Sequence, residues 1–555
     1  MKDSNLTPWK RFLGLLQLEK KDIFQIFYYA IFSGIVALSL PLGIQAIINL
    51  IQGAQISTSW IILVILVTIG VIFSGGLQLM QLRIIETIQQ RVFTKSAFEL
   101  SYRFPKIKMN ELRNYYPPEL ANRFFDTLTI QKGLSKILID VPSAFLQIIF
   151  ALLLLSFYHP FFILFGVLLL MLVFIVFKYT AQKGLETSLE ESKNKYKVAH
   201  WIQEIARTIV SFKLSGQSSL ALDKNDELVN KYLKSREKHF HILIIQVIQM
   251  ISFKVLITAG LLTIGGALVL NQEMNIGQFV AAEIIILLVI NSVEKLILGL
   301  ESFYDVLTSI EKLGQVVDKE LESQEGDKPK FNQLNIELDK TYYKVPNREK
   351  LIIDDISFSV KKESRILIKG ESGSGKSSLL RLISGVVNPS QGNIYINNVS
   401  LNSLHLNHYR SQLGLSLSEE TPFEGTLKEN ITFGNKQISD EFIFETLNKV
   451  GLTQYVKELP NGLQTILQPD GKQISYTIAK KIVLARAIAK QPKVLILEDP
   501  LDRFNTRESE EIINYLTDKK QPWSLIVVSS NPAWESRCNE QITLQKGQIL
   551  NHKKC

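Results

Sequence analysis

The stretch SRILIKGESGSGKSSLLRLISG, residues 364–385, decides the fold of the C-terminal half of the chain. It opens with a run at 365–369 that is typical of a buried β-strand, and it closes with residues that favour a helix. Between them, Gly370 to Ser377 follow the spacing G-x-x-x-x-G-K-[ST], which lets backbone N–H groups surround phosphates at a helix N-terminus. The stretch therefore predicts a strand, a phosphate-binding loop and a helix in an α/β domain.

The residue types of this loop favour ATP with Mg²⁺ as its ligand. The Lys376 ammonium supplies a point charge for the β- and γ-phosphates, and the Ser377 hydroxyl is a ligand for Mg²⁺. The residues of the loop that we expect to bind the nucleotide are Gly370, Glu371, Ser372, Gly373, Ser374, Gly375, Lys376, Ser377 and Ser378.

The N-terminal half consists of long apolar runs that indicate membrane spans. Residues 23–82 contain no Asp, Glu, Lys or Arg, whereas one spanning helix needs only about 20 apolar residues. A second uncharged run, 141–177, is divided by His159-Pro160, which marks a tight turn. We predict six spans, near 24–47, 60–80, 141–158, 160–178, 248–270 and 277–297.

Loop charge predicts the orientation of these spans. The loops at 81–140 and 178–240 hold ten and twelve Lys or Arg residues, and the three short loops on the other side hold none. Positive loops stay in the cytoplasm, so both long loops and both termini are predicted to be cytoplasmic. Glu283 lies within the sixth span, and two roles stay open for it: lining a substrate path, or a neutral or paired glutamate near the outer interface.

The net charge of +9 agrees with this topology. Basic cytoplasmic loops suit an anionic membrane surface, so no nucleic-acid partner is expected. Only two cysteines are present, Cys538 and Cys555, which excludes a disulfide framework, and no residues have metal-cluster spacing.

Several further segments, together with six spans and the loop, resemble the ABC exporter half-transporters. They are YYPPELANRFFDT (115–127), SFKLSGQ (211–217), FEGTLKENITFG (423–434), ELPNGLQT (458–465) and IVLARAIAKQPKVLILEDP (482–500). The membrane part is most similar to exporters of the type I secretion and peptide-export kind.

The resemblance implies a multi-domain membrane protein, with a six-helix ABC exporter transmembrane domain followed by an α/β P-loop ABC ATPase domain. Residues 1–320 form the membrane domain, the charged stretch 321–330 is a linker, and 331–555 form the nucleotide domain in the cytoplasm. It also implies an inner or plasma membrane location and pairing, either as a homodimer or with a second half-transporter. A periplasmic adaptor is a further partner of exporters of this kind.

Four of the motifs that such transporters use for hydrolysis differ here. Where the family has the signature L-S-G-G-Q, this chain reads Ile474-Ser475-Tyr476-Thr477-Ile478. The loop glutamine of the family falls on Ser418, which is too short to reach from the backbone to Mg²⁺ and water. The switch histidine falls on Ser530, and the D-loop reads Asp502-Arg503-Phe504-Asn505.

The acidic pair after the strand VLILEDP, residues 494–500, is also reversed in order. Glu498 occupies the place that organises Mg²⁺, and Asp499 occupies the place of the catalytic glutamate. Asp499 is one methylene shorter, and a shift of about 1 Å can lower a rate by about 10²-fold. We therefore expect Glu498 as a metal ligand with Ser377, and Asp499 as a weak catalytic residue.

Family members usually stack an aromatic ring on the adenine. Tyr342 and Tyr343 lie at a suitable distance before the loop, and Tyr343 is slightly preferred; the alternative is that both are ordinary strand residues.

Two functions remain open. The first is an ATP-binding exporter subunit that moves a peptide, protein or lipophilic compound out of the cytoplasm and hydrolyses ATP weakly. The second is a non-transporting, ATP-sensing pseudo-transporter or regulatory partner. The sequence names neither the substrate nor the choice between homodimer and heterodimer, and it leaves open whether hydrolysis reaches a useful rate.

Overall fold

The computed structural model describes residues 7–52, 58–345 and 349–554, with the side chain of residue 172 excepted. These residues form two compact units. The helical unit contains the described residues up to 105 and residues 114–319, and the α/β unit contains residues 106–113 and those from 320 onward. Cys555 and part of the loop between the first two predicted spans lie outside the described residues.

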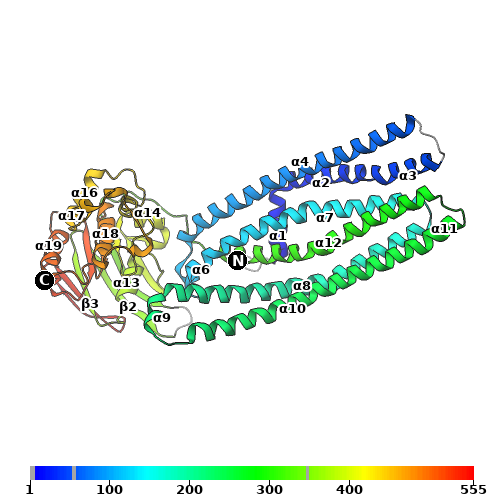
Figure 1. Cartoon of the computed structure of the whole chain (residues 1–555). Coiled ribbons are helices and arrows are strands. Elements are labelled where there is room, and N and C mark those ends of the chain that lie inside the picture. The colour runs from blue at the N-terminus through cyan, green and yellow to red at the C-terminus, as the bar shows by residue number, and fades with distance from the viewer. Residues whose placement is uncertain (1–6, 53–57, 346–348, 555) are drawn as a thin grey trace. The chain divides into compact units, whose positions relative to one another are not determined.

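The helical unit is built from long helices that run beside one another (Figure 1). Six helical stretches are long and apolar enough to cross a membrane, which confirms the six predicted spans. Its helices are α1 (Pro8–Leu18), α2 (Lys20–Ala37), α3 (Ser39–Gln52), α4 (Thr58–Arg103), α6 (Pro117–Asn122), α7 (Asp126–Ser156), α8 (Phe161–Arg207), α9 (Ile209–Leu214), α10 (Leu220–Gly260), α11 (Gly266–Leu270) and α12 (Ile276–Val317).

Four of these helices are longer than a bilayer requires. Helices α4, α8, α10 and α12 have 46, 47, 41 and 42 residues, which at about 1.5 Å per residue is roughly 60–70 Å, against a hydrocarbon core of about 30 Å. The apolar half of each helix suits lipid, and the charged half continues as a helix beyond it. Between α7 and α8 the chain turns at His159-Pro160, as predicted.

Several polar groups inside the helical unit are paired across helices. The Lys254 ammonium on α10 contacts the Glu294 carboxylate on α12. The Gln246 amide donates to the Thr180 hydroxyl at 2.9 Å and to the Tyr304 hydroxyl at 3.0 Å, so α8, α10 and α12 share one hydrogen-bonded group. Glu283 is half-buried on α12, and its role stays open.

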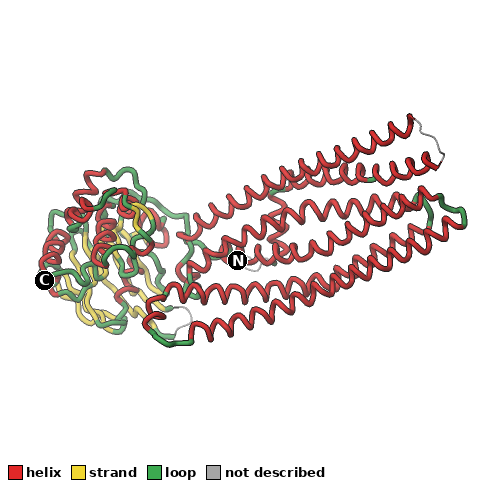
Figure 2. The backbone as a smooth tube through the Cα atoms, in the orientation of Figure 1, coloured by secondary structure: helices red, strands yellow, loops and turns green. Residues whose placement is uncertain are grey.

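The α/β unit contains all the strands that are longer than one bridge (Figure 2). Its main sheet has six strands in the order β12-β11-β3-β10-β9-β6, all parallel except β12, and a second, antiparallel sheet has the order β2-β1-β4-β5. The strands are β1 (Ile336–Lys344), β2 (Leu351–Val360), β3 (Arg365–Gly370), β4 (Gln391–Ile396), β5 (Val399–Ser400), β6 (Leu413–Ser416), β7 (Gly425–Thr426), β8 (Ile466–Leu467), β9 (Val494–Glu498), β10 (Ser524–Val528), β11 (Glu540–Gln545) and β12 (Gln548–Lys554).

Helices cover both faces of the six-stranded sheet. The main helices are α13 (Lys376–Ile383), α14 (Leu406–Ser411), α15 (Leu427–Thr432), α16 (Asp440–Lys449), α17 (Thr453–Glu458), α18 (Tyr476–Ala489) and α19 (Thr506–Thr517). Every residue of β9 and β10 is buried, because a parallel sheet with helices on both sides needs continuous apolar strands. Along β9, Val494 and Ile496 enter one core while Leu495 and Leu497 enter the other. The carboxyl ends of β3, β9 and β10 therefore meet at one edge of the sheet, which places the site.

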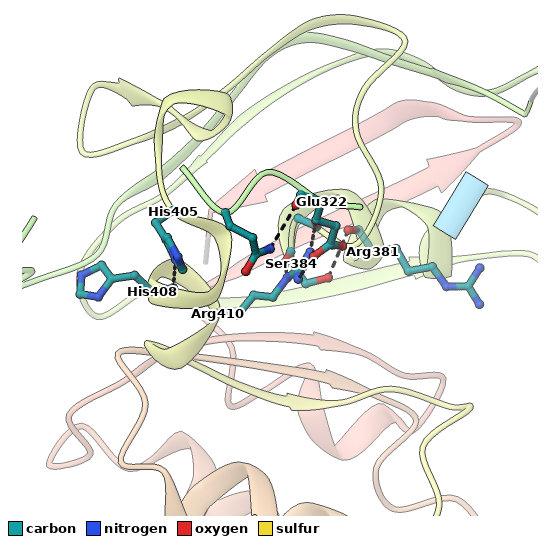
Figure 3. Close-up of polar contacts among 8 residues, drawn as sticks. Glu322, Arg381, Ser384, His405, His408 and Arg410 are labelled. Atoms are coloured by element: carbon teal, nitrogen blue, oxygen red, sulfur yellow. Dashed lines mark hydrogen bonds and ion pairs between the residues drawn. The ribbon is translucent and has the colours of Figure 1, made fainter. Parts of the chain in front are cut away.

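The α/β unit includes residues that the sequence analysis placed in the membrane domain and in the linker. The short helix α5 (Met109–Leu112) and its neighbours belong to this unit, since Ile107 bridges Leu321 and the Lys108 N–H donates to the Glu320 carbonyl at 3.0 Å. The predicted linker 321–330 is fixed to the same unit. Figure 3 shows the Arg410 guanidinium holding both Glu322 carboxylate oxygens, at 2.6 and 2.9 Å.

Candidate nucleotide-binding site

The glycine loop connects β3 to α13 as the sequence predicts. Gly375 has φ 103°, in the left-handed region, and a Cβ there would lie 2.8 Å from the Ile352 carbonyl. A Cβ on Gly370 would lie 2.3 Å from the Leu544 carbonyl. These positions need glycine because the backbone turns tightly between packed strands, and the turn directs the loop toward the start of α13.

The loop carries donors suited to phosphate oxygens. The Lys376 ammonium lies over the loop and donates to the carbonyls of Gly370 and Glu371, each at 2.8 Å. The Ser374 hydroxyl is buried and has no hydrogen-bond partner among the described residues. Backbone N–H groups, one ammonium and the first turn of a helix together fit a polyphosphate.

Two lysines that the sequence analysis missed lie beside the loop. A cavity of about 200 Å³ is lined by residues 371–374 and by Lys350, at the start of β2, and Lys546, in the turn between β11 and β12. No local pattern marks these lysines, because the turns that carry them are remote in sequence from the loop. Their ammonium groups add positive charge to the phosphate side of the site.

The strand end β9 places Glu498 against two serines. The Ser377 hydroxyl donates to one oxygen of the buried Glu498 carboxylate. The other oxygen accepts from the Ser418 N–H at 3.1 Å and from the Ser418 hydroxyl at 2.9 Å. The three side chains thus form one network, and their oxygen atoms are of the kind that Mg²⁺ prefers.

This network changes the interpretation of Ser418. On its own a serine is too short to reach a metal from its loop, but Glu498 is one methylene longer than aspartate and reaches Ser418 instead. The long acid and the short loop residue therefore complement each other in length. Ser418 belongs to the site as a residue that orients Glu498.

Asp499 follows the strand in a left-handed conformation, with φ 42°. Its N–H donates to the Val528 carbonyl at 2.9 Å, which fixes the backbone at the edge of the sheet. The pKa of Asp499 lies above its usual range, mainly because of partial burial and secondly because Glu498 and Asp502 are negative neighbours. The carboxylate therefore stands at the site where a water-polarising acid is expected by resemblance.

A buried lysine that the sequence analysis missed also reaches this region. Lys480 lies on α18, and its ammonium donates to the Ser418 carbonyl at 3.2 Å. The signal in the sequence is the pair Lys480-Lys481 inside a mainly apolar helix. Lys480 thereby fixes the loop that carries Ser418. Its positive charge also favours the ionised form of Asp499.

The signature and D-loop positions touch each other. Ser475 begins α18 and its hydroxyl accepts from the Ile478 N–H at 3.3 Å. The exposed Tyr476 ring lies 4.9 Å from the Arg503 guanidinium, and its hydroxyl donates to Asp502 at 3.4 Å. Tyr476 therefore forms one exposed polar and aromatic group with Asp502 and Arg503.

The remaining predicted residues lie apart from the phosphates or lack the expected contact. Ser530 is exposed two residues after the end of β10, and its hydroxyl is its only polar side-chain group. The prediction that Tyr343 stacks on adenine is wrong, because its ring is only 3 % exposed within the core and its hydroxyl accepts from Arg113. Its ring packs within the core, so Tyr343 is an ordinary strand aromatic.

The Glu498–Ser418 network predicts coupled mutations. We expect Glu498→Asp and Ser418→Gln each to weaken Mn²⁺ binding with nucleotide about tenfold, as loss of a ligand-orienting group does. The double variant exchanges both lengths and should recover most of the affinity. Electron paramagnetic resonance of bound Mn²⁺ measures the effect, and Ser411→Gln, at an exposed serine, is the matched control. Additive losses in the double variant contradict the coupling.

The chain matches two models of known families. Residues 23–293 match the ABC transporter transmembrane region, and residues 353–502 match the ABC transporter model. In structure the chain is similar to a bacterial Atm1-family ABC exporter with ATP bound, with a TM-score of 0.84 over 96 % of this chain and 95 % of that one. The sequence identity to that exporter is 16 %, so this likeness concerns the fold.

Three curated relatives illustrate the range of proteins that this chain resembles in sequence. The ATP-dependent lipid A-core flippase of Pseudoalteromonas atlantica is 24 % identical over 80 % of this chain and 79 % of its own length. The ATP-dependent permease MDL1 of Candida albicans is 30 % identical over 53 % of this chain, and the alpha-hemolysin translocation ATP-binding protein HlyB of Escherichia coli is 27 % identical over 56 %. The matches span 44 % of the length of each of these two proteins.

Proposed function

The chain belongs to the ABC transporter family, and we propose that it is a half-transporter subunit that exports a substrate from the cytoplasm with ATP bound at Gly370 to Ser378. Peptides, proteins and lipophilic compounds are the substrate classes that fit the resemblance. The observation that carries the proposal is an unbroken phosphate loop, with an acidic strand end beside it, on the same chain as six membrane spans.

Each residue of the site has a definable role in nucleotide binding. Lys376 and the backbone N–H groups bind the phosphates, and Lys350 and Lys546 add positive charge beside them. Ser377 and Glu498 would hold Mg²⁺, with Ser418 orienting Glu498. When bound, the metal would neutralise negative charge on the phosphates. Asp499 would polarise water weakly because its side chain is short.

The exposed group formed by Tyr476, Asp502 and Arg503 supports pairing of two such chains. In the family these positions meet the nucleotide of a partner, and here they carry side chains that offer aromatic and charged contacts. We propose a dimer, formed either by two copies or with a second half-transporter. A non-transporting ATP sensor is the second candidate function. It is favoured by the reversed acid pair, by the serines at positions 418 and 530, and by the altered signature at 474–478.

The multi-pass protein lies in the inner or plasma membrane with its α/β unit in the cytoplasm. The ten and twelve Lys or Arg residues in the two long loops support this orientation.

Lys376→Ala is expected to abolish most ATP binding by the purified full-length chain. The change removes the ammonium from the phosphates, and a charged hydrogen bond contributes about 1.5–3 kcal/mol, so affinity should fall by about tenfold or more. Titration with a fluorescent ATP analogue in nanodiscs measures it. Lys436→Ala, at an exposed lysine of the same unit, should bind normally. Equal affinity of both variants and the parent for the ATP analogue would show that the glycine loop does not bind ATP. That result would contradict the proposed function.

A further inference from the structure

The helical unit has a polar cavity that the transporter family assignment does not explain. Its volume is about 590 Å³, and it lies among α6, α8, α10 and α12. Five Lys or Arg side chains line it, together with His200 and only two carboxylates. The five are Arg123, Lys193, Lys197, Lys224 and Lys312.

Two of these cations are more than nine-tenths buried. Lys312 on α12 is 7 % exposed, and among the described residues its ammonium makes no hydrogen bond and no ion pair; it lies 5.3 Å from the Tyr196 ring. Arg123 is 6 % exposed; its guanidinium donates to the Gln315 side-chain oxygen, while its Nε has no hydrogen-bond partner among the described residues. A buried ammonium without a hydrogen bond is unfavourable, so such groups are usually bonded.

The few carboxylates near the cavity do not balance its positive charge. Both oxygens of Glu204 are held by Arg207. Glu119 is shared, since its oxygens lie 4.0 Å from Arg123 and 3.4 Å from the His200 ring. Outside the lining, the buried Asp126 carboxylate accepts from the Tyr196 hydroxyl, and its negative charge also acts on Lys312 and Arg123. The cavity keeps an excess of positive charge, and burial together with Arg123 lowers the pKa of Lys312.

The position of the cavity excludes a lipid head group. Lys193 follows residue 178, the predicted end of the fourth span, by 15 positions along α8, and Lys312 follows residue 297 by 15 positions along α12. At about 1.5 Å per residue both lie roughly 22 Å beyond the span along the helix. The ligand must therefore come from water.

We propose that this cavity binds a soluble phosphate-bearing anion, held by Lys312 and Arg123 and surrounded by Lys193, Lys197 and Lys224. Phosphate suits the site because one group carries more than one negative charge and several acceptor oxygens, and lysine and arginine both donate to it. The anion joins α12 to the segment around Arg123 by bridging their cations. Its source is free inorganic phosphate or the phosphates of a nucleotide, and this second site is separate from the glycine loop.

Chemical labelling of Lys312 tests the proposal on the intact chain. The full-length protein carrying Lys376→Ala, so that the glycine loop contributes little, is treated with a small acetylating reagent, and modified lysines are counted by mass spectrometry. Inorganic phosphate is expected to slow acetylation of Lys312 about tenfold relative to sodium chloride at equal ionic strength, since the ammonium is then bonded. Lys183, exposed on the same helix α8 that carries Lys193, should be unaffected. Parallel arms with ATP identify which source of phosphate binds.

Mutation of the second cation supplies an independent readout. Arg123→Gln should abolish protection of Lys312 by phosphate and raise the phosphate dissociation constant about tenfold in calorimetry, whereas Lys183→Gln should change neither. Protection of Lys312 by phosphate or by ATP supports the site. Acetylation at the same rate in phosphate, ATP and chloride overturns it, as does unchanged protection in Arg123→Gln. Because Lys376 is already absent, these outcomes do not depend on the nucleotide site.

Discussion

ATP turnover by the purified chain is expected to be about 10²-fold slower than turnover by a variant in which six of the altered hydrolytic positions are repaired. Asp499 is one methylene short, and a displacement of about 1 Å costs about that factor. Ser530 lacks an imidazole, and Tyr476 and Thr477 place side chains where a partner's phosphate must approach. These groups act on one transition state. Single repairs should therefore raise the turnover rate only slightly, and combined repairs should raise it by more than the product of the single gains.

The comparison needs four proteins, the fourth being Asp499→Asn, and one readout. Steady-state phosphate release is measured for the parent, for Asp499→Glu, and for the combined variant. The combined variant carries Glu498→Asp, Asp499→Glu, Ser418→Gln, Ser530→His, Tyr476→Gly and Thr477→Gly. Glu498 and Ser418 must change together, because they bond to each other at 2.9 Å. Fast turnover by the parent that disappears in Asp499→Asn would show that the reversed acid pair works.

Arg486→Ala is expected to destabilise the helices around the acidic strand by about 3–5 kcal/mol, as removal of one partner from a buried charged network does. Arg486 is 4 % exposed, and its guanidinium donates to the Asn430 carbonyl at 2.7 Å and to the Asn430 side chain at 3.0 Å. It also lies 4.8 Å from the Phe433 ring and 3.7 Å from Glu420. Its loss leaves several buried groups without partners.

Hydrogen exchange in the full-length protein measures this effect locally. Amide protection in α15 and α18 should fall by about 10²- to 4 × 10³-fold, the factor that corresponds to 3–5 kcal/mol. Arg507→Ala removes an arginine from α19 whose side chain is 91 % exposed, and this variant should exchange like the parent because exposed ion pairs contribute little. Unchanged protection in Arg486→Ala would show that the network does not hold the two helices together.

The sequence by itself determined the six spans, the strand, loop and helix around Lys376, and the buried strand that ends at Glu498. Each is a local pattern: an uncharged run of about 20 residues, a fixed spacing of glycines, or a short apolar run. Such patterns act within a few turns or one strand, so adjacent residues suffice to predict them. The two-sided burial of the central strands followed from the same local composition.

Only the tertiary structure decided which remote side chains meet. Ser418 and Glu498 are 80 residues apart, and their complementary lengths have meaning only because β6 and β9 pair in one sheet. Tyr343 was misplaced for the same reason, since the packing of two sheets rather than its sequence position turned its ring into the core. Lys312 and Arg123 come from helices that sequence spacing does not relate, and burial gives their charges an effect that an exposed pair would not have. Side-chain contact, burial and local dielectric depend on long-range packing, which a single sequence does not display.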